Sequence, residues 1–423
     1  MEDHPPAVVL VPTSADSAAL VDPGTQDGRR SLARSGGLVA PALTLVNVIG
    51  YLLAVAASRA LDANGYGELN ALLGVLLVAS VPALALQAVV ARSVARRPAR
   101  ETPGPRERAL LVRACATGAV VSGLAALTAP VVAAFLHVGV AGPLWVAAGL
   151  LPLAVLSAAM GLLQGAERFG ALALVICAQA VGKAVGLMPL AIDGDPAAVL
   201  AALALGTAVA AGLALALVAR GGSPSPRSPL QLPGLREGAA AASGLFALLA
   251  LANLDLLLAR NVLPGDESGR YSVGAVCAKA AFWLPQVVAV VVFPRLSEPD
   301  AGRAVLRRAV LVVVGLTLLE VAGAALLARP VLELTFGESY GSLAPLAPLF
   351  VLQGGALSVV QLLVYRAIAT RDPLPGRVLL LALPVEAAVI LTVDPRSPGP
   401  VIAVATAVAV LLTVALVVRS RRT

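Results

Sequence analysis

Five ionisable side chains lie inside long apolar stretches of the chain, where an unpaired charge is costly. They are Lys183, Asp255, Lys279, Glu320 and Glu386. A charge at the centre of a membrane-spanning helix costs about 2.5–3.5 kcal/mol on insertion scales, and such residues usually line a cargo or ion pathway or pair with one another. These five residues are therefore the first candidates for a binding or ion-coupling site.

The two lysines are the only lysines in the chain, which otherwise uses arginine as its strong base. A lysine ammonium is a compact charge that can meet a phosphate group. We therefore predict that Lys279 and Lys183 contact an anionic substrate. Gln179 lies one helical turn before Lys183 on the same helix face, which makes it the third substrate-binding candidate. The alternative is that both lysines form buried structural ion pairs with the acidic residues.

The three acidic residues, Asp255, Glu320 and Glu386, are candidates for charge pairing or for coupling transport to H⁺, Na⁺ or the membrane potential. Asp255 lies near the end of its apolar run, so Arg260 is an alternative partner for it. If all five charged residues face one another, they line a polar cavity between the two halves of the molecule.

Several kinds of chemistry are not supported by the sequence. The cysteines are isolated within apolar runs and the two histidines are far apart, so we expect no disulfide framework, metal or cofactor. The chain has no Walker A loop and no local catalytic set of Ser/His/Asp or Cys/His type, so it is predicted not to be an enzyme. The basic residues lie in short pieces without aromatic neighbours, which argues against nucleic acid and favours membrane lipids as partners.

The elements that position these residues are predicted to be membrane-spanning helices. Hydrophobic residues make up 59% of the 423 positions and charged residues 13%, which predicts an all-α integral membrane protein. Twelve apolar runs alternate with short polar breaks, and most reach the ~20 residues that a span needs. They are 37–57, 69–90, 110–136, 144–163, 169–192, 196–218, 238–259, 271–293, 309–327, 343–365, 378–393 and 400–418.

The runs divide into two sets of six. We expect a disordered cytoplasmic tail at 1–35, an N-terminal six-helix lobe at 36–219, a cytoplasmic linker at 220–237, a C-terminal six-helix lobe at 238–418 and a basic tail at 419–423. With the N-terminus inside, 24 arginines fall on the cytoplasmic side and five outside, as the positive-inside rule requires. This bias predicts a multi-pass protein of the plasma membrane with both termini in the cytoplasm.

Two hydrophobic hairpins, 47–92 and 252–295, follow the same pattern. Each contains an apolar run ending in arginine, a turn with a tyrosine, and a second run with a proline ten residues before another arginine; the residues are Arg59, Tyr66, Pro82 and Arg92 in the first copy and Arg260, Tyr271, Pro285 and Arg295 in the second. The repeat predicts two pseudo-equivalent lobes. Pro82, Pro285 and Pro384 are expected to kink their spans.

Short motifs resemble a known family. Arg59-Ala-Leu61 with Tyr66-Gly67 resembles the R-x-L-G-x-x-x-Y-G turn of bacterial Wzx-type polysaccharide flippases, which belong to the multidrug/oligosaccharidyl-lipid/polysaccharide (MOP) exporter superfamily. NLDLLLAR at 253–260, KAAFWLP at 279–285, FPR at 293–295 and FGESY at 336–340 resemble other segments of the same proteins. Asp62 departs from the pattern, since the family usually has glycine there.

The resemblance implies two MATE-like six-helix lobes around a central cavity. It also implies a flippase that moves a polyprenyl-diphosphate-linked oligosaccharide from the cytoplasmic to the outer leaflet by alternating access, for cell-surface polysaccharide synthesis. Glycosyltransferases or a polymerase of the same pathway are the implied protein partners. A MATE-like ion-coupled antiporter of drugs or small molecules is one alternative. A membrane scaffold that docks glycosyltransferases through its cytoplasmic loops is another.

Overall fold

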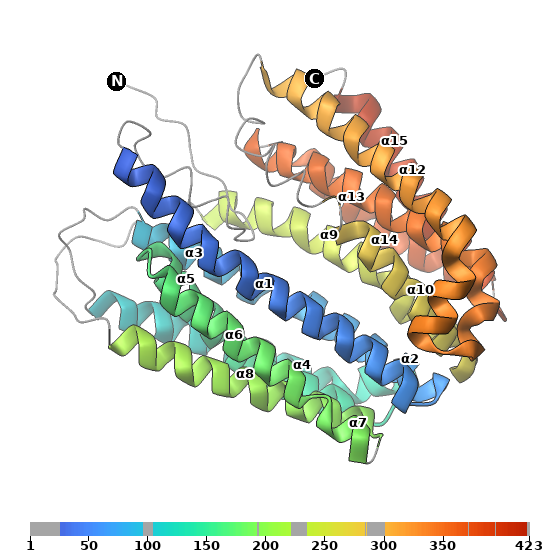
Figure 1. Ribbon diagram of the computed structural model, residues 1–423, viewed down its shortest axis with the longest axis horizontal. Helices are drawn as coiled ribbons and strands as arrows, with labels where there is room; N and C mark the ends of the chain where they lie inside the picture. The colour runs from blue at the N-terminus through green and yellow to red at the C-terminus, as the bar shows by residue number, and fades with distance from the viewer. Residues whose placement is uncertain are drawn as a thin grey trace.

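The chain folds into helices joined by short turns. The computed structural model describes residues 26–95, 105–192, 194–220, 235–283, 285, 301–370, 372–393 and 395–420, and no strand occurs among these residues. The helices divide into two groups that meet at one end and diverge toward the end where α1 begins and α15 ends (Figure 1). The predicted all-α class is therefore confirmed.

The first group of helices forms the N-terminal lobe. Its elements are α1 (Gln26–Ala60), α2 (Ala63–Ala79), α3 (Val81–Ala95), α4 (Pro105–Leu136), α5 (Ala141–Gly165), α6 (Phe169–Val185), α7 (Met188–Ile192) and α8 (Pro196–Ala219). Helix α5 packs against α3, α4 and α8, and α6 packs against α1 and α8. Because α5 is surrounded in this way, it is the most buried of the candidate spans of this lobe.

The second group forms the C-terminal lobe. Its elements are α9 (Leu235–Val262), α10 (Gly265–Trp283), α12 (Ala301–Phe336), the 3₁₀ helix η3 (Glu338–Leu346), α13 (Ala347–Ala369), α14 (Leu374–Val393) and α15 (Pro398–Ser420). Helix α13 packs against α10, α12 and α15, while α9 packs against α14. The central helix of this lobe is thus α13.

Eleven segments of the described chain are long and apolar enough to cross a membrane, and each coincides with one of the predicted runs. The eighth predicted run, 271–293, begins in α10, but Leu284 and residues 286–293 lie outside the described part of the chain. Some boundaries differ from expectation. Helix α1 begins at Gln26, inside the stretch expected to be a disordered tail, and α9 begins at Leu235, inside the expected linker. Composition marks where apolar residues stop, whereas a helix can continue beyond the hydrocarbon into polar residues.

Two of the three prolines expected to kink spans coincide with breaks in the helices. The second predicted span is split at Ser80 into α2 and α3, two residues before Pro82, and α10 ends at Trp283, two residues before Pro285. A proline removes a backbone donor and clashes with the preceding turn, so it favours such a break. Helix α14 instead continues through Pro384.

The two lobes meet through a shared hydrophobic core. This core contains Tyr66 from the N-terminal lobe and Tyr271 from the C-terminal lobe, both completely buried. Tyr66 packs edge-on against Tyr340, with ring centroids 6.4 Å apart, and Tyr271 packs edge-on against Phe350 at 5.0 Å. The tyrosines that marked the sequence repeat therefore occupy comparable places in the two lobes.

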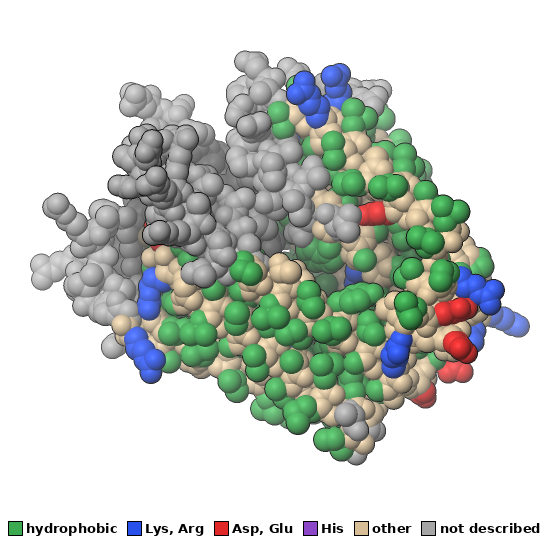
Figure 2. All heavy atoms as spheres, in the orientation of Figure 1, with side chains coloured by type: hydrophobic (Ala, Val, Ile, Leu, Met, Phe, Trp, Pro, Cys, Tyr) green, Lys and Arg blue, Asp and Glu red, His purple; other side chains and the backbone are tan. Residues whose placement is uncertain are grey.

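The outer surface has the pattern of a membrane protein. On the face shown in Figure 2, hydrophobic side chains cover the middle of the molecule, and most charged side chains gather toward its ends. Many large apolar residues are exposed along α12, such as Leu319 and Leu326. These surfaces suit contact with lipid tails.

Replacing Gly354 by alanine is expected to weaken the C-terminal lobe. A Cβ at Gly354 would lie 2.0 Å from the carbonyl oxygen of Ala278, so α10 and α13 would have to move apart. Overpacking of this kind typically costs about 1–3 kcal/mol, which should appear as a lower thermal unfolding temperature of the purified protein. Gly315→Ala is the matched control, because a Cβ there has no neighbour within 4 Å in the described structure. Equal unfolding temperatures for the two variants would contradict this packing.

Candidate functional site

A cavity of about 390 Å³ lies within the N-terminal lobe, between α1, α2, α3, α5, α6 and α8. Most of its lining is aliphatic. The polar or aromatic side chains that line it are Ser80, Trp145, Ser157, Gln179, Lys183 and Thr207. The sequence prediction placed Lys183 and Gln179 together on one helix face, and both do line this cavity.

The local fold positions Lys183 at the end of α6. The helix ends at Val185, so the ammonium lies in its last turn, where the helix dipole favours a positive charge. Gly182 and Gly206 allow α6 and α8 to approach closely, because a Cβ on either glycine would lie within 3.0 Å of the other's backbone. On the opposite side Gly50 of α1 leaves room for the lysine, since a Cβ there would be 3.8 Å from Nζ.

The lining of the cavity contains one basic side chain and no acidic one. Lys183 is partly buried, and none of the residues that line the cavity is acidic. The predicted alternative was a structural ion pair between Lys183 and a buried acid, and the ion pairs found among the described residues do not include Lys183. The hydroxyls of Ser80 and Thr207 donate to backbone carbonyls of their own helices but can still accept. A lysine and several hydroxyls in an apolar wall can hold an anionic group attached to a hydrophobic chain.

The second group of predicted residues lies in the C-terminal lobe, around Asp255. This side chain is 2% exposed, and its Oδ2 accepts hydrogen bonds from the Tyr271 hydroxyl at 2.6 Å and from Nε2 of Gln353 at 3.0 Å. Arg260, the partner considered from sequence, instead donates to Asn64, Ser268 and the backbone of α4. Asp255 therefore links α9, α10 and α13.

Two more candidates lie near this carboxylate. Lys279 on α10 and Glu386 on α14 both lie near enough to Asp255 for an electrostatic interaction with its side chain. Glu386 is 2% exposed, and its Oε1 has no hydrogen-bond partner among the described residues. The Asp255 cluster, comprising Asp255, Tyr271, Lys279, Gln353 and Glu386, is thus a buried polar centre in the C-terminal lobe.

The structure does not gather all the predicted residues in one place. Lys279 is not among the residues that line the N-terminal cavity, and Glu320 lies apart on α12. Both carboxylate oxygens of Glu320 are without a hydrogen-bond partner in the described part of the chain. The six residues thus divide into an N-terminal cavity with Lys183 and Gln179, the Asp255 cluster, and Glu320 alone.

Several functional candidates were missed from sequence. Trp145, Ser157 and Thr207 line the cavity beside Lys183, but each lies on a different helix or far along the chain, so no local spacing connects them. Gln353 was not among the predicted site residues, although it donates to the carboxylate of Asp255. In the sequence Gln353 stands out only as a polar residue within an apolar run, and this does not identify its hydrogen-bond partner.

A family model identifies the family of this chain, and solved structures identify its fold. Residues 32–299 match the family model described as "Polysaccharide biosynthesis protein". A search of curated proteins finds no match.

Solved structures with the same fold include an inward-facing multidrug resistance MATE family transporter of the MOP superfamily, with TM-score 0.64, 14% identity, and 88% of this chain and 93% of that chain covered. The eukaryotic MATE transporter AtDTX14 matches with TM-score 0.59 and 14% identity, covering 93% and 98%. A mutant of the Vibrio cholerae MATE transporter VcmN matches with TM-score 0.59 and 16% identity, covering 92% and 96%. The predicted MATE-like fold of two lobes is confirmed.

Proposed function

Since this chain belongs to the polysaccharide biosynthesis protein family and has the fold of MOP-superfamily transporters, we propose that it is a flippase for polyprenyl-diphosphate-linked oligosaccharides. The family and the fold indicate a transporter rather than an enzyme. In the proposed cycle the two lobes alternate in exposing a cavity to the cytoplasmic and the outer side, and the glycan moves outward. No covalent step is involved.

The observation that carries this proposal is the N-terminal cavity. Its single cation, Lys183, faces no acidic lining residue and can attract a diphosphate, while Ser80, Ser157, Gln179 and Thr207 offer hydrogen bonds to oxygen atoms. The aliphatic remainder of the wall suits the first isoprene units of a lipid carrier. A cationic drug would meet a like charge at the same place.

Binding to this cavity can be followed through Trp145. The chain has two tryptophans, so a Trp283→Phe variant leaves Trp145 as the single indole reporter. We expect a polyprenyl-diphosphate oligosaccharide to change its fluorescence saturably, and a neutral polyprenol or a cationic dye to do so only weakly. The same titration with Lys183→Gln should shift the midpoint at least about tenfold, since charge-assisted hydrogen bonds contribute about 1.5–3 kcal/mol. Saturable binding of the dye and not of the diphosphate would refute the proposed substrate class.

We place the protein in the plasma membrane with both termini in the cytoplasm, on the strength of the arginine distribution. Cysteines introduced at Gly139 and Ser397, both exposed, should then react with a membrane-impermeant maleimide added to intact cells. A cysteine at the exposed Thr370 should react only after the cells are permeabilised. The introduced cysteines are placed in a variant from which the three native cysteines have been removed. Labelling of Thr370→Cys in intact cells would overturn the proposed orientation.

The Asp255 cluster supports a second element of the proposal, which is coupling to H⁺ or Na⁺. Asp255 and Glu386 are two buried carboxylates of the C-terminal lobe; Asp255 accepts from one hydroxyl and one amide, and Lys279 lies near it. Such a centre can exchange a cation or a proton as its surroundings open and close. In this proposal Lys279 interacts with Asp255, and Lys183 makes the main contact with the substrate. The glycosyltransferases or polymerase of the same pathway are proposed partners.

A further inference from the structure

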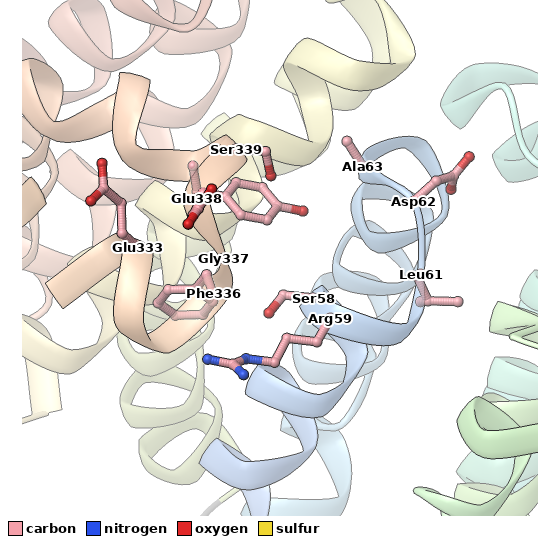
Figure 3. Close-up of a pocket in the computed structure, with 11 residues that line it drawn as sticks. Ser58, Arg59, Leu61, Asp62, Ala63, Glu333, Phe336, Gly337, Glu338 and Ser339 are labelled. Atoms are coloured by element: carbon pink, nitrogen blue, oxygen red, sulfur yellow. The ribbon is translucent and has the colours of Figure 1, made fainter. Parts of the chain in front are cut away.

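Arg59, the last basic residue of α1, crosses from the N-terminal lobe to the C-terminal lobe. Its Nε donates to the carbonyl of Thr335 at 3.0 Å, and its Nη2 donates to the carbonyl of Leu334. Both carbonyls belong to the last turn of α12, where the helix itself leaves such groups without donors. Figure 3 shows the guanidinium extending from α1 toward the end of α12, where Phe336 lies. Arg59 therefore caps a helix of the other lobe.

Arg260, at the end of α9, makes the reverse connection. It is 5% exposed, and it donates through Nε to the carbonyl of Leu136 at 3.0 Å and through Nη2 to the carbonyl of His137 at 3.3 Å. Its Nη1 also donates to Oδ1 of Asn64 at 2.7 Å. The next residue, Asn261, donates to the carbonyl of Phe135 at 2.6 Å. The C-terminal lobe thus caps the end of α4 in the N-terminal lobe.

The two connections are related by the internal repeat. Arg59 and Arg260 occupy equivalent places in the two hairpins that repeat in the sequence, and α4 and α12 are each the third predicted span of their lobe. Each capped helix is followed by a residue with positive φ, His137 at 52° after α4 and Gly337 at 118° after α12. Such a residue turns the chain away from the helix axis, and the last carbonyls of a helix have no donor within the helix. Each lobe therefore supplies an arginine that caps the third predicted span of the other lobe.

We infer that Arg59 and Arg260 form a reciprocal latch that holds the two lobes closed at the end of the molecule where α1 and α9 end, and that both caps must release before this end can open. Guanidinium groups suit such a role, because several donors in one plane can hold adjacent carbonyls while a helix C-terminus attracts the positive charge. When the caps release, water can replace the lost hydrogen bonds of both guanidinium groups. The inference depends on the transporter fold of the family and not on the nature of the cargo.

The surroundings of the latch fit an interface that can separate. Beside Arg59 a cleft of about 600 Å³ lies between the α1 to α2 turn, with Asp62, and the α12 to η3 turn, with Glu338 (Figure 3). The two lobes also contact each other through small residues of α2 and α10: a Cβ on Gly269 would lie 1.8 Å from the carbonyl of Ala63. Water can reach Arg59 from this cleft, since the side chain is exposed.

The latch can be tested without any substrate. Spin labels on cysteines at Gly139 and Ser339, which are exposed on opposite lobes at the latched end, report the distance between the lobes by pulsed electron resonance. A Cβ at Gly139 meets no atom within 4 Å of the described structure, so the label is accommodated. Relative to the parent protein, Arg59→Gln and Arg260→Gln should each raise the ratio of long to short distances about tenfold, and the double variant further.

Arg270→Gln is the matched control, since Arg270 pairs with Glu267 of its own helix and not with a described residue of the other lobe. The Arg270→Gln variant should show the same distribution of distances between the spin labels as the parent protein. Arg260 is buried, so the Arg260→Gln variant could fail to fold. In that case the Arg59→Gln variant decides the outcome, because Arg59 is exposed. A variant counts as folded if it elutes as a single species in size-exclusion chromatography. A folded Arg59→Gln protein with the parent's distance distribution would overturn the latch. Because no cargo is added, failure of the proposed glycan substrate would leave this result unaffected.

Discussion

Lys183→Gln is expected to reduce transport of a polyprenyl-diphosphate oligosaccharide by about 10- to 100-fold. Loss of a charge-assisted hydrogen bond to the diphosphate removes about 1.5–3 kcal/mol, and each 1.4 kcal/mol is tenfold in affinity. Lys183 is the single cation in the lining of the N-terminal cavity, so no other lining residue can replace its charge. The initial rate of transport into liposomes at subsaturating substrate measures the effect.

Two variants separate the charge from the space that the side chain fills. Lys183→Arg keeps the cation and should retain most of the rate, whereas Gln179→Ala removes a neutral neighbour in the same cavity and should cost less than tenfold. If Lys183→Gln and Lys183→Arg transport equally well, the positive charge at this position has no part in substrate recognition.

Asp255→Ala is expected to destabilise the C-terminal lobe by about 2–5 kcal/mol. The Tyr271 hydroxyl and the Gln353 amide would both lose their acceptor, and each buried donor left without a partner costs about 1–3 kcal/mol. Asp255→Asn keeps an acceptor and should cost much less. Thermal unfolding of the purified variants measures the difference.

The same variants separate a structural from a coupling role for Asp255. If the cluster couples transport to a cation, Asp255→Asn should fold normally but lose the dependence of transport on an H⁺ or Na⁺ gradient. Glu320→Ala is the control for removal of a carboxylate, because no described residue bonds the carboxylate of Glu320 and its loss leaves no donor without an acceptor. A gradient dependence retained in Asp255→Asn would restrict Asp255 to holding α9, α10 and α13 together.

The spans could be predicted because their signal is local and physical. Some twenty apolar residues in a row, such as 196–218, have no other stable arrangement than a helix across the bilayer. The equivalence of Tyr66 and Tyr271 could also be predicted, since both hairpins have arginine, tyrosine, proline and arginine in the same order, with identical spacing between the proline and the second arginine. The position of Gln179 beside Lys183 followed from the helical period, which relates residues four apart.

The parts that could not be predicted depend on contacts between distant segments. Gln353 reaches Asp255 across 98 positions, and Arg260 reaches Leu136 across 124. The acceptors of Arg260 include backbone carbonyls. Every residue has a backbone carbonyl, so the sequence does not show which ones accept these hydrogen bonds. The separation of Glu320 from the Asp255 cluster within one lobe depends on how the helices pack, and depth in the membrane alone does not determine it.

The most direct test of the proposed function is movement of a fluorescent polyprenyl-diphosphate oligosaccharide across liposomes that contain the purified protein. An impermeant quencher added outside measures the fraction of label in each leaflet over time. A flippase of this kind should give rapid exchange with the wild-type protein and little exchange with the Lys183→Gln, Lys279→Gln double variant. If the wild-type protein moves no lipid-linked glycan but accumulates a cationic dye against a pH or Na⁺ gradient, the proposed flippase function is contradicted and the chain is a drug antiporter on the same fold.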